Sequence, residues 1–250
     1  MNEEKFSGKA EDYMRYRPSY PEELLDYLYS EVGFNQAHSV ADIGAGTGIW
    51  SKLLASRNSS VICVEPNVDM LNMAKENLAH EPTCSFVKAP AEHTTLADHS
   101  VDYITVAQAF HWFEPALFKL ECKRILKDNG KVVLVWNSRD YTDQVTIECA
   151  EMNQRFCPEF KGFSGGIGDN PDVFDAFFSN GDYEFKVFNY DLTLDEESFI
   201  GRSLSASYAP HKTSSNYDEY VSELKNLFQR NSVNGLMVMR NKTRCYVGKV

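Results

Sequence analysis

Apolar runs and amphipathic stretches alternate along the first 137 residues of the chain. Short apolar runs without polar alternation are typical of strands buried on both faces of a parallel sheet. They span residues 38–43, 60–65, 85–88, 101–107 and 131–136. The intervening segments carry apolar residues at helical spacing, over residues 21–32, 49–55, 68–80 and 115–126. Strands that alternate with helices in this way predict a doubly wound α/β fold.

The pattern changes after Asn137, where helical stripes become longer and strands rarer. Apolar spacing predicts helices over residues 143–157 and 217–228, and the acids after Thr193 predict another helix start. Residues 186–192 and 243–248 are expected to be strands. The second part of the chain therefore adds two strands, together with helices and loops that could cover a site.

Charge and composition narrow the classes of partner. The chain has 25 Lys and Arg against 36 Asp and Glu, a net charge of −11, which disfavours binding to nucleic acid. No apolar stretch approaches the ~20 residues of a membrane span, and the N-terminus has no secretory apolar core. The six cysteines lack metal-site spacing, so we expect reduced, mostly buried thiols and no metal. A cytoplasmic protein without membrane contact is the expectation.

A glycine-rich turn follows the first strand, with the sequence DIGAGTG over residues 42–48. A strand, such a turn and a helix together predict a ligand held by backbone N–H groups. The nicotinamide fingerprint GxGxxG would place its third glycine at position 49, which is Ile49. Asp42 disfavours a pyrophosphate in this turn and suits a ligand that carries an ammonium or sulfonium group.

Glu65 ends the second predicted strand, and a carboxylate there can accept hydrogen bonds from both hydroxyls of a ribose. Together with Asp42 and the glycine turn, it indicates an adenosyl ligand without phosphate, which S-adenosylmethionine fits. The alternative is a tight turn that needs small residues, beside a Glu65 that is merely solvated.

Further motifs along the chain match, in the same order, those of a known family. They are VEPN from residue 64, APAEHTTL from 89, VDYITVAQAFHWF from 101 and RILKDNGKVVLV from 124. With DIGAGTG, they make the chain resemble class I S-adenosylmethionine-dependent methyltransferases. The similarity is to the small-molecule branch that includes the trans-aconitate and ubiquinone-pathway methyltransferases. It implies a Rossmann-like, seven-stranded, mostly parallel sheet with an antiparallel terminal strand, and a helical cap over the site.

The resemblance also implies which residues bind S-adenosylmethionine. In AEDYMRYRPSYP the chain resembles a helix that closes over the cofactor, where Arg17 would pair with the methionine carboxylate. The family usually has Pro-Gly where this chain has residues 128–130, DNG, which are still expected to form a turn. The implied cofactor-binding residues are Tyr13, Arg17, Asp42, Gly44, Ala45, Gly46, Glu65, Pro66, Ala91, Glu92 and Gln108.

Candidates on the acceptor side follow the fourth and fifth strands. His111 is the candidate catalytic residue, as a general base or to orient the acceptor, and could equally be a structural histidine. Methyl transfer is an in-line displacement that depends strongly on alignment, and an ionised carboxylate acceptor needs no base. Arg139 could bind an acidic acceptor or be a solvated loop residue. Ser205, Ser207 and Tyr208 are candidates for lining the acceptor pocket.

We expect one methyltransferase domain over residues 1–250, as a monomer or homodimer. Its parts would be an N-terminal lid and first helix (1–36), the cofactor-binding core (37–140), cap segments (141–181 and 193–235) and final strands (182–192 and 236–250). The leading hypothesis is methyl transfer to a small molecule. The alternatives are methylation of a macromolecule and a non-catalytic S-adenosylmethionine-binding module that acts through a partner.

Overall fold

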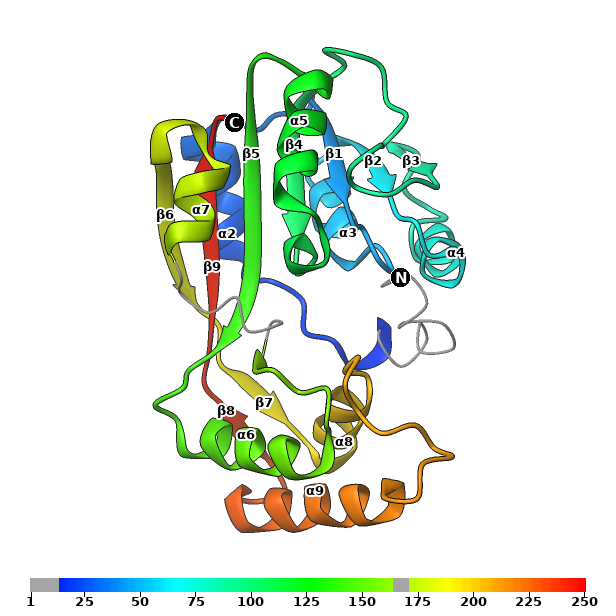
Figure 1. Ribbon diagram of the computed structural model, residues 1–250, viewed down its shortest axis with the longest axis vertical. Helices are drawn as coiled ribbons and strands as arrows, with labels where there is room; N and C mark the ends of the chain where they lie inside the picture. Colours follow the sequence, from blue (N-terminus) through cyan, green and yellow to red (C-terminus); the bar gives the residue numbers. More distant parts are fainter. Residues whose placement is uncertain (1–13, 164–170) are drawn as a thin grey trace.

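The computed structural model describes residues 14–163 and 171–250 and is built around a seven-stranded sheet in the order β3-β2-β1-β4-β5-β9-β6 (Figure 1). Strand β9 runs antiparallel to both of its neighbours, β5 and β6, whereas the pairs from β3 to β5 are parallel. The predicted Rossmann-like sheet with one antiparallel strand is therefore confirmed. The strands are β1 Ser39–Ile43, β2 Ser60–Val64, β3 Cys84–Val87, β4 Val101–Ala107, β5 Leu126–Arg139, β6 Tyr183–Asn189 and β9 Asn241–Gly248.

Both faces of the sheet are buried, and β5 shows how its sequence achieves this. Val132 and Leu134 belong to the apolar cluster on one face, and Val133 and Val135 to the cluster on the other. A strand covered on both sides needs no polar alternation, which explains the uninterrupted apolar runs. The helices of this part are α2 Glu22–Tyr27, continued by a π-helical turn Leu28–Val32, and α3 Ile49–Ser56, α4 Val68–Asn77, α5 Pro115–Ile125 and α7 Pro171–Phe177.

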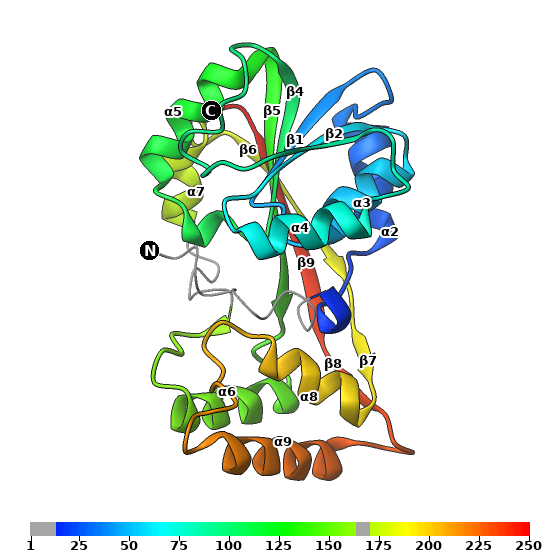
Figure 2. The same cartoon turned by 90° about the vertical axis from the view of Figure 1, so that its right-hand side faces the viewer.

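A second layer, the cap, lies beyond the carboxyl ends of the parallel strands (Figures 1 and 2). It consists of α6 Gln144–Phe156, α8 Glu196–Leu204, α9 Tyr217–Asn231 and a small sheet of β7 Leu192–Leu194 and β8 Met237–Met239. Its buried side chains form an apolar cluster separate from those of the main sheet. No helix in the described part of the chain is long and apolar enough to cross a membrane.

Two predicted boundaries are wrong at the junction of sheet and cap. The strand expected to end at Leu192 ends at Asn189, because the chain turns there into β7 of the small sheet. Asp191 stabilises the turn, since its Oδ1 accepts a hydrogen bond of 3.1 Å from the backbone N of Asn241. The range 236–250, expected to hold only the final strand, also contains β8 of the cap.

Helix α7 packs on the main sheet although it lies inside the range 141–181 that was assigned to the cap. Phe174 stacks on Tyr246 with 4.0 Å between ring centroids, and Phe177 stacks on Phe118 of α5 at 5.7 Å. Its aromatic residues therefore bury against β9 and α5, and Figure 1 shows α7 beside these elements. The sequence pattern identified the apolar residues of this segment but did not indicate which surface they would cover.

The expected turn at residues 128–130 lies inside β5 as a bulge. Val101 pairs with Leu126, yet the next pair is Tyr103 with Lys131, so residues 127–130 lie opposite Asp102 alone. An added Cβ at Gly130 would lie 3.0 Å from the carbonyl oxygen of Asp102, which explains the glycine. The turn predicted at residues 128–130 is therefore wrong, since these residues lie within β5 as a bulge.

Candidate functional site

A cavity of about 700 Å³ lies between the sheet and the cap. The ends of β1, β4 and β5 form its floor, and residues 158–163 with α8 and the turn after it form its roof. Ligands of doubly wound folds bind outside the carboxyl ends of the parallel strands, which is where this cavity lies. Of the residues predicted to bind the cofactor or to act in catalysis, seven line it: Arg17, Asp42, Gly44, Ala45, Gly46, Gln108 and His111.

The glycine turn shapes the floor. A Cβ added to Gly44, whose φ is +71°, would lie 2.5 Å from the Cβ of Ala109, so no larger residue fits. Gly46, with φ of +56°, has no atom within 4 Å of the position that its Cβ would take. A side chain at Gly46 would fill this space, as expected of a turn whose backbone approaches a ligand.

Glu65 presents a nearly buried carboxylate beside this turn. Its Oε2 accepts a hydrogen bond of 2.9 Å from the backbone N of Gly46, and its Oε1 accepts one of 2.9 Å from the N of Asn67. Glu65 does not itself line the cavity, and neither does Pro66. The carboxylate thus lies one hydrogen bond from a residue of the cavity floor, and its role toward a ribose stays a prediction.

Asp42 lies at the cavity floor but its carboxylate is fully buried. Its Oδ2 accepts a hydrogen bond from Ser51 Oγ of α3, and its Oδ1 accepts one of 3.3 Å from Thr105 Oγ1 of β4. Burial raises the pKa of Asp42 to about 7, against the lowering effect of these two hydroxyls. The predicted contact with a cationic ligand would therefore also stabilise the ionised form of Asp42.

Gln108 and Asn137 connect the floor to the N-terminal segment. Gln108, with φ of +58°, donates from Nε2 to the carbonyl oxygen of Asn137 over 2.9 Å. Asn137 in turn donates from Nδ2 to the carbonyl oxygen of Ser19 over 2.8 Å and accepts from Thr243 Oγ1. This network fixes the ends of β4, β5 and β9 relative to the segment that carries Arg17.

Arg17 and His111 face the cavity from different elements. Arg17 donates from Nη2 to the carbonyl oxygen of Ser205 over 3.2 Å, which links the N-terminal segment to the end of α8. The Nδ1 of His111 is buried and has no hydrogen-bond partner within the described ranges. Burial, with a smaller effect of the Arg17 charge, lowers the pKa of His111 to about 4, so its imidazole is neutral at pH 7.

Two further arginines line the cavity, Arg139 at the end of β5 and Arg202 in α8. The guanidinium carbon of Arg139 lies 3.8 Å from the ring centroid of Phe163, so the predicted solvated loop residue is instead packed against an aromatic face. Arg202 of α8, which the sequence analysis missed, is only 7% exposed and lines the same cavity. Its position three residues after Phe199, on the buried side of the helix, was the available signal.

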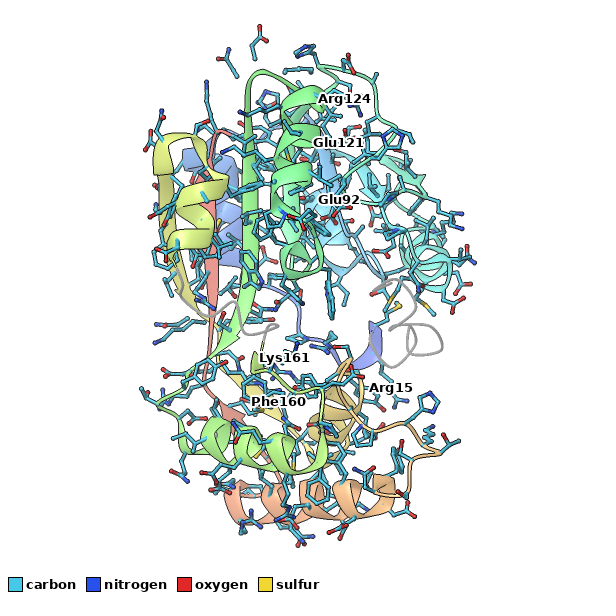
Figure 3. The ribbon with its side chains drawn as sticks, in the orientation of Figure 1. Arg15, Glu92, Glu121, Arg124, Phe160 and Lys161 are labelled. Carbon is cyan, nitrogen blue, oxygen red and sulfur yellow. The ribbon has the colours of Figure 1, made fainter. Side chains whose placement is uncertain are left out.

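Besides Glu65 and Pro66, the predicted residues Ala91 and Glu92 do not line the cavity within the described parts of the chain. Ala91 is buried in the sheet core, and Glu92 Oε1 accepts a hydrogen bond of 2.8 Å from the N of Glu114 at the start of α5. Figure 3 shows Glu92 beside α5, apart from Phe160 and Lys161 between sheet and cap. Tyr13 lies outside the described residues. The predicted roles of these residues toward the cofactor stay predictions.

The acceptor-side candidates at the end of α8 are brought to the roof. Ser207 and Tyr208 line the cavity, while Ser205 contributes the carbonyl oxygen that binds Arg17. Residues of the floor and roof that were not singled out from the sequence include Thr47, Trp50, Trp112, Lys161 and Phe163. Thr47 and Trp112 lie within the motifs quoted above, whereas Lys161 and Phe163 precede the cap helices α8 and α9 and carry no local motif.

The comparisons with known proteins agree with this geometry. The sequence family described as "Methyltransferase domain" matches residues 41–134. An uncharacterized methyltransferase of Mycobacterium tuberculosis is 39% identical over 135 residues, which are 54% of this chain and 53% of that protein. The chain thus matches about half the length of such curated relatives.

Solved structures extend the similarity of fold to most of the chain. A proposed type II methyltransferase from Anaeromyxobacter dehalogenans has a TM-score of 0.69 at 19% identity, over 94% of this chain and 98% of that one. A Haemonchus contortus phosphoethanolamine N-methyltransferase 2, in complex with phosphomonomethylethanolamine and S-adenosylhomocysteine, has a TM-score of 0.58 at 16% identity. It covers 99% of this chain and 59% of that one. At these identities the structures establish a shared fold.

Proposed function

We propose that the protein is a class I methyltransferase that transfers a methyl group from S-adenosylmethionine to a small-molecule acceptor, and the match of residues 41–134 to the methyltransferase domain family supports this. The single observation that carries the proposal is the cavity of about 700 Å³ between the glycine turn and the cap. A pocket of this size accommodates a cofactor and a small acceptor.

The residues present fit this cofactor. The open space at Gly46 allows close approach of a ligand to the backbone, and the nearly buried Glu65 carboxylate lies beside it. Glu65 would exchange its hydrogen bond from Gly46 for bonds from ribose hydroxyls, and Arg17 would hold the methionine carboxylate. Pro66, Ala91, Glu92 and Gln108 complete the proposed set, with Asp42 behind the turn.

When bound, S-adenosylmethionine supplies a methyl group on a cationic sulfur, which is ready for in-line displacement. The protein would then contribute by aligning the cofactor with the acceptor and by excluding water with the cap, since the cofactor and the acceptor would be held in one cavity. His111 would orient the acceptor as a neutral hydrogen-bonding group, or accept its proton where the acceptor carries one.

The first experiment measures cofactor binding. Calorimetry is expected to detect binding of S-adenosylhomocysteine and none of NAD, because the turn lacks the third glycine of a pyrophosphate site. Glu65→Ala should weaken S-adenosylhomocysteine binding about ten- to hundredfold, since a lost charged acceptor costs ~1–3 kcal/mol. Glu81→Ala, an intermediate-exposure carboxylate away from the cavity, is the control. Tight NAD binding without a response to S-adenosylhomocysteine would contradict the proposal.

The second experiment identifies the class of acceptor. The protein is incubated with methyl-labelled S-adenosylmethionine and a cell extract separated by size. Label in the low-mass fraction supports the proposal, whereas label only in protein or nucleic acid indicates a macromolecular acceptor. Binding of S-adenosylhomocysteine without any labelled product would instead favour a non-catalytic module.

A further inference from the structure

Three arginines from distant parts of the sequence line the same cavity. Arg17 precedes α2, Arg139 ends β5, and Arg202 lies in α8. Burial, with smaller effects of the Arg139 and Arg17 charges, lowers the pKa of Arg202 well below its ordinary value, so both neighbouring charges act on Arg202. Like charges gathered in a partly dehydrated cavity are stabilised when an anion binds between them.

Arg202 is the most deeply placed of these cations. Its side chain is more than nine-tenths buried, and its Nε has no hydrogen-bond partner within the described parts of the chain. Its Nη1 lies 3.8 Å from the sulfur of Met239, which is a weak acceptor. A buried guanidinium without a carboxylate partner is costly, so an acceptor oxygen from a ligand would stabilise this arrangement.

Arg139 is held in a complementary way. Phe163 packs against its guanidinium at 3.8 Å, and the described residues provide it with no ion pair. Stacking occupies the flat face of a guanidinium and leaves its N–H groups along the edge free to donate. The ring therefore orients Arg139 while leaving its hydrogen-bonding capacity for a ligand in the cavity.

The cofactor alone does not account for all three arginines. Under the proposed function, Arg17 binds the methionine carboxylate, and one bidentate arginine suffices for one carboxylate. We propose that Arg139 and Arg202 bind an oxyanion group, a carboxylate or a phosphate, of the methyl acceptor, which is therefore an acidic small molecule. This inference rests on the proposed function and specifies its substrate class.

The net charge of the chain makes this local arrangement selective. At −11, the protein repels anions at long range, most strongly extended ones such as nucleic acid. Within the cavity the balance of charge is reversed. The described residues that line it include four basic ones, Arg17, Arg139, Lys161 and Arg202, and two acidic ones, Asp42 and Glu159. A small acid can enter this region, whereas a polyanion meets the acidic exterior.

The test begins with the low-mass extract described above, separated on an anion-exchange resin. The methyl-accepting activity is expected in the retained fraction. One aliquot of that fraction is amidated with carbodiimide and methylamine, and another is treated with phosphatase. Loss of acceptor activity on amidation identifies a carboxylate, and loss on phosphatase treatment identifies a phosphate. Acceptor activity only in the unretained fraction, or activity that survives both treatments, overturns the inference.

Variants then test the two residues. Arg139→Gln and Arg202→Gln should each raise the acceptor KM about ten- to hundredfold and leave the dissociation constant of S-adenosylhomocysteine within twofold. Arg155→Gln is the matched control, because Arg155 also packs on a phenylalanine ring, that of Phe156, but does not line the cavity. Arg139 is only partly buried, so its variant remains informative even where the variant of buried Arg202 fails to fold.

The outcomes separate this inference from the proposed function. If Arg139→Gln and Arg202→Gln weaken S-adenosylhomocysteine binding instead of raising the acceptor KM, the two arginines hold the cofactor and the inference is wrong. A methylated neutral molecule would also overturn it while leaving the proposed function intact. If no low-mass fraction is methylated although S-adenosylhomocysteine binds, the proposed function itself fails, and the inference fails with it.

Discussion

The floor and the roof of the cavity are built from the sequence in different ways. The floor comes largely from two short stretches, residues 42–50 and 107–112, each directly after a strand of the parallel sheet. The roof combines residues 158–163 with Arg202, Ser207 and Tyr208, and these depend on a cap with its own apolar cluster. The floor is thus set by local turns, and the roof by packing between helices that are far apart in the chain.

This difference separates cofactor binding from acceptor recognition. A glycine turn binds through backbone groups, so its sequence is constrained wherever the same ligand is used. The roof binds through side chains on α8 and the preceding loop, which are free to vary without disturbing the sheet. We expect changes in the glycine turn of the floor to affect the cofactor and changes in the roof to affect the acceptor.

The largest expected effect is at the floor. Gly46→Val should abolish S-adenosylhomocysteine binding, by at least about a hundredfold, because its side chain would occupy the open space at the turn. Gly235→Val is the matched control. Gly235 also has a positive φ, +75°, and no atom within 4 Å of its Cβ position, but it lies away from the cavity.

Both valine variants carry a similar backbone strain of ~1–2 kcal/mol, so calorimetry and thermal unfolding separate strain from lost ligand space. Equal loss of cofactor binding in Gly46→Val and Gly235→Val would show that the effect comes from stability and not from the turn.

An intermediate effect is expected in the cap. Leu224→Ala, in the apolar cluster of the cap, should destabilise it by about 2–5 kcal/mol and remove methyl transfer while S-adenosylhomocysteine still binds. Leu134→Ala, in the sheet core, should reduce both methyl transfer and the binding of S-adenosylhomocysteine. Hydrogen exchange measures where protection is lost. Simultaneous loss of protection in the cap and the sheet of Leu224→Ala would show that the two regions unfold as one unit.

A smaller effect on stability is expected from the titration of Asp42, at the floor of the cavity. Because burial raises the pKa of Asp42 to about 7, the folded protein keeps a proton that the unfolded chain loses from about pH 4 upward. The contribution of this group to the free energy of unfolding is complete below about pH 4 and is lost as the pH rises through 7, by ~1.4 kcal/mol per pH unit at most.

Asp42→Asn should therefore flatten the decrease in stability between pH 5 and 7, measured by denaturant titration. Parallel pH profiles of the variant and the unchanged protein would indicate that Asp42 is ionised in the folded state throughout this range.

The sequence predicted the sheet well because each strand carries its own evidence. The run at residues 131–136 indicated burial on both faces, and Val133 and Leu134 confirm it from opposite sides. It predicted the helix starts where a side chain caps the backbone, as Asp195 does for the N of Ser198. It failed at α7, because an aromatic stripe such as that of Phe174 and Phe177 does not indicate which surface will cover it.

By itself the sequence determined the strand–turn–helix unit around Gly44 and Gly46, and with it the kind of cofactor, because the backbone conformation of a tight turn is dictated by adjacent residues. Only the tertiary structure decided which side chains meet across the cavity. Arg139 and Arg202 are separated by more than sixty positions and belong to a strand end and a cap helix. Their proximity results from long-range packing, which no local spacing encodes.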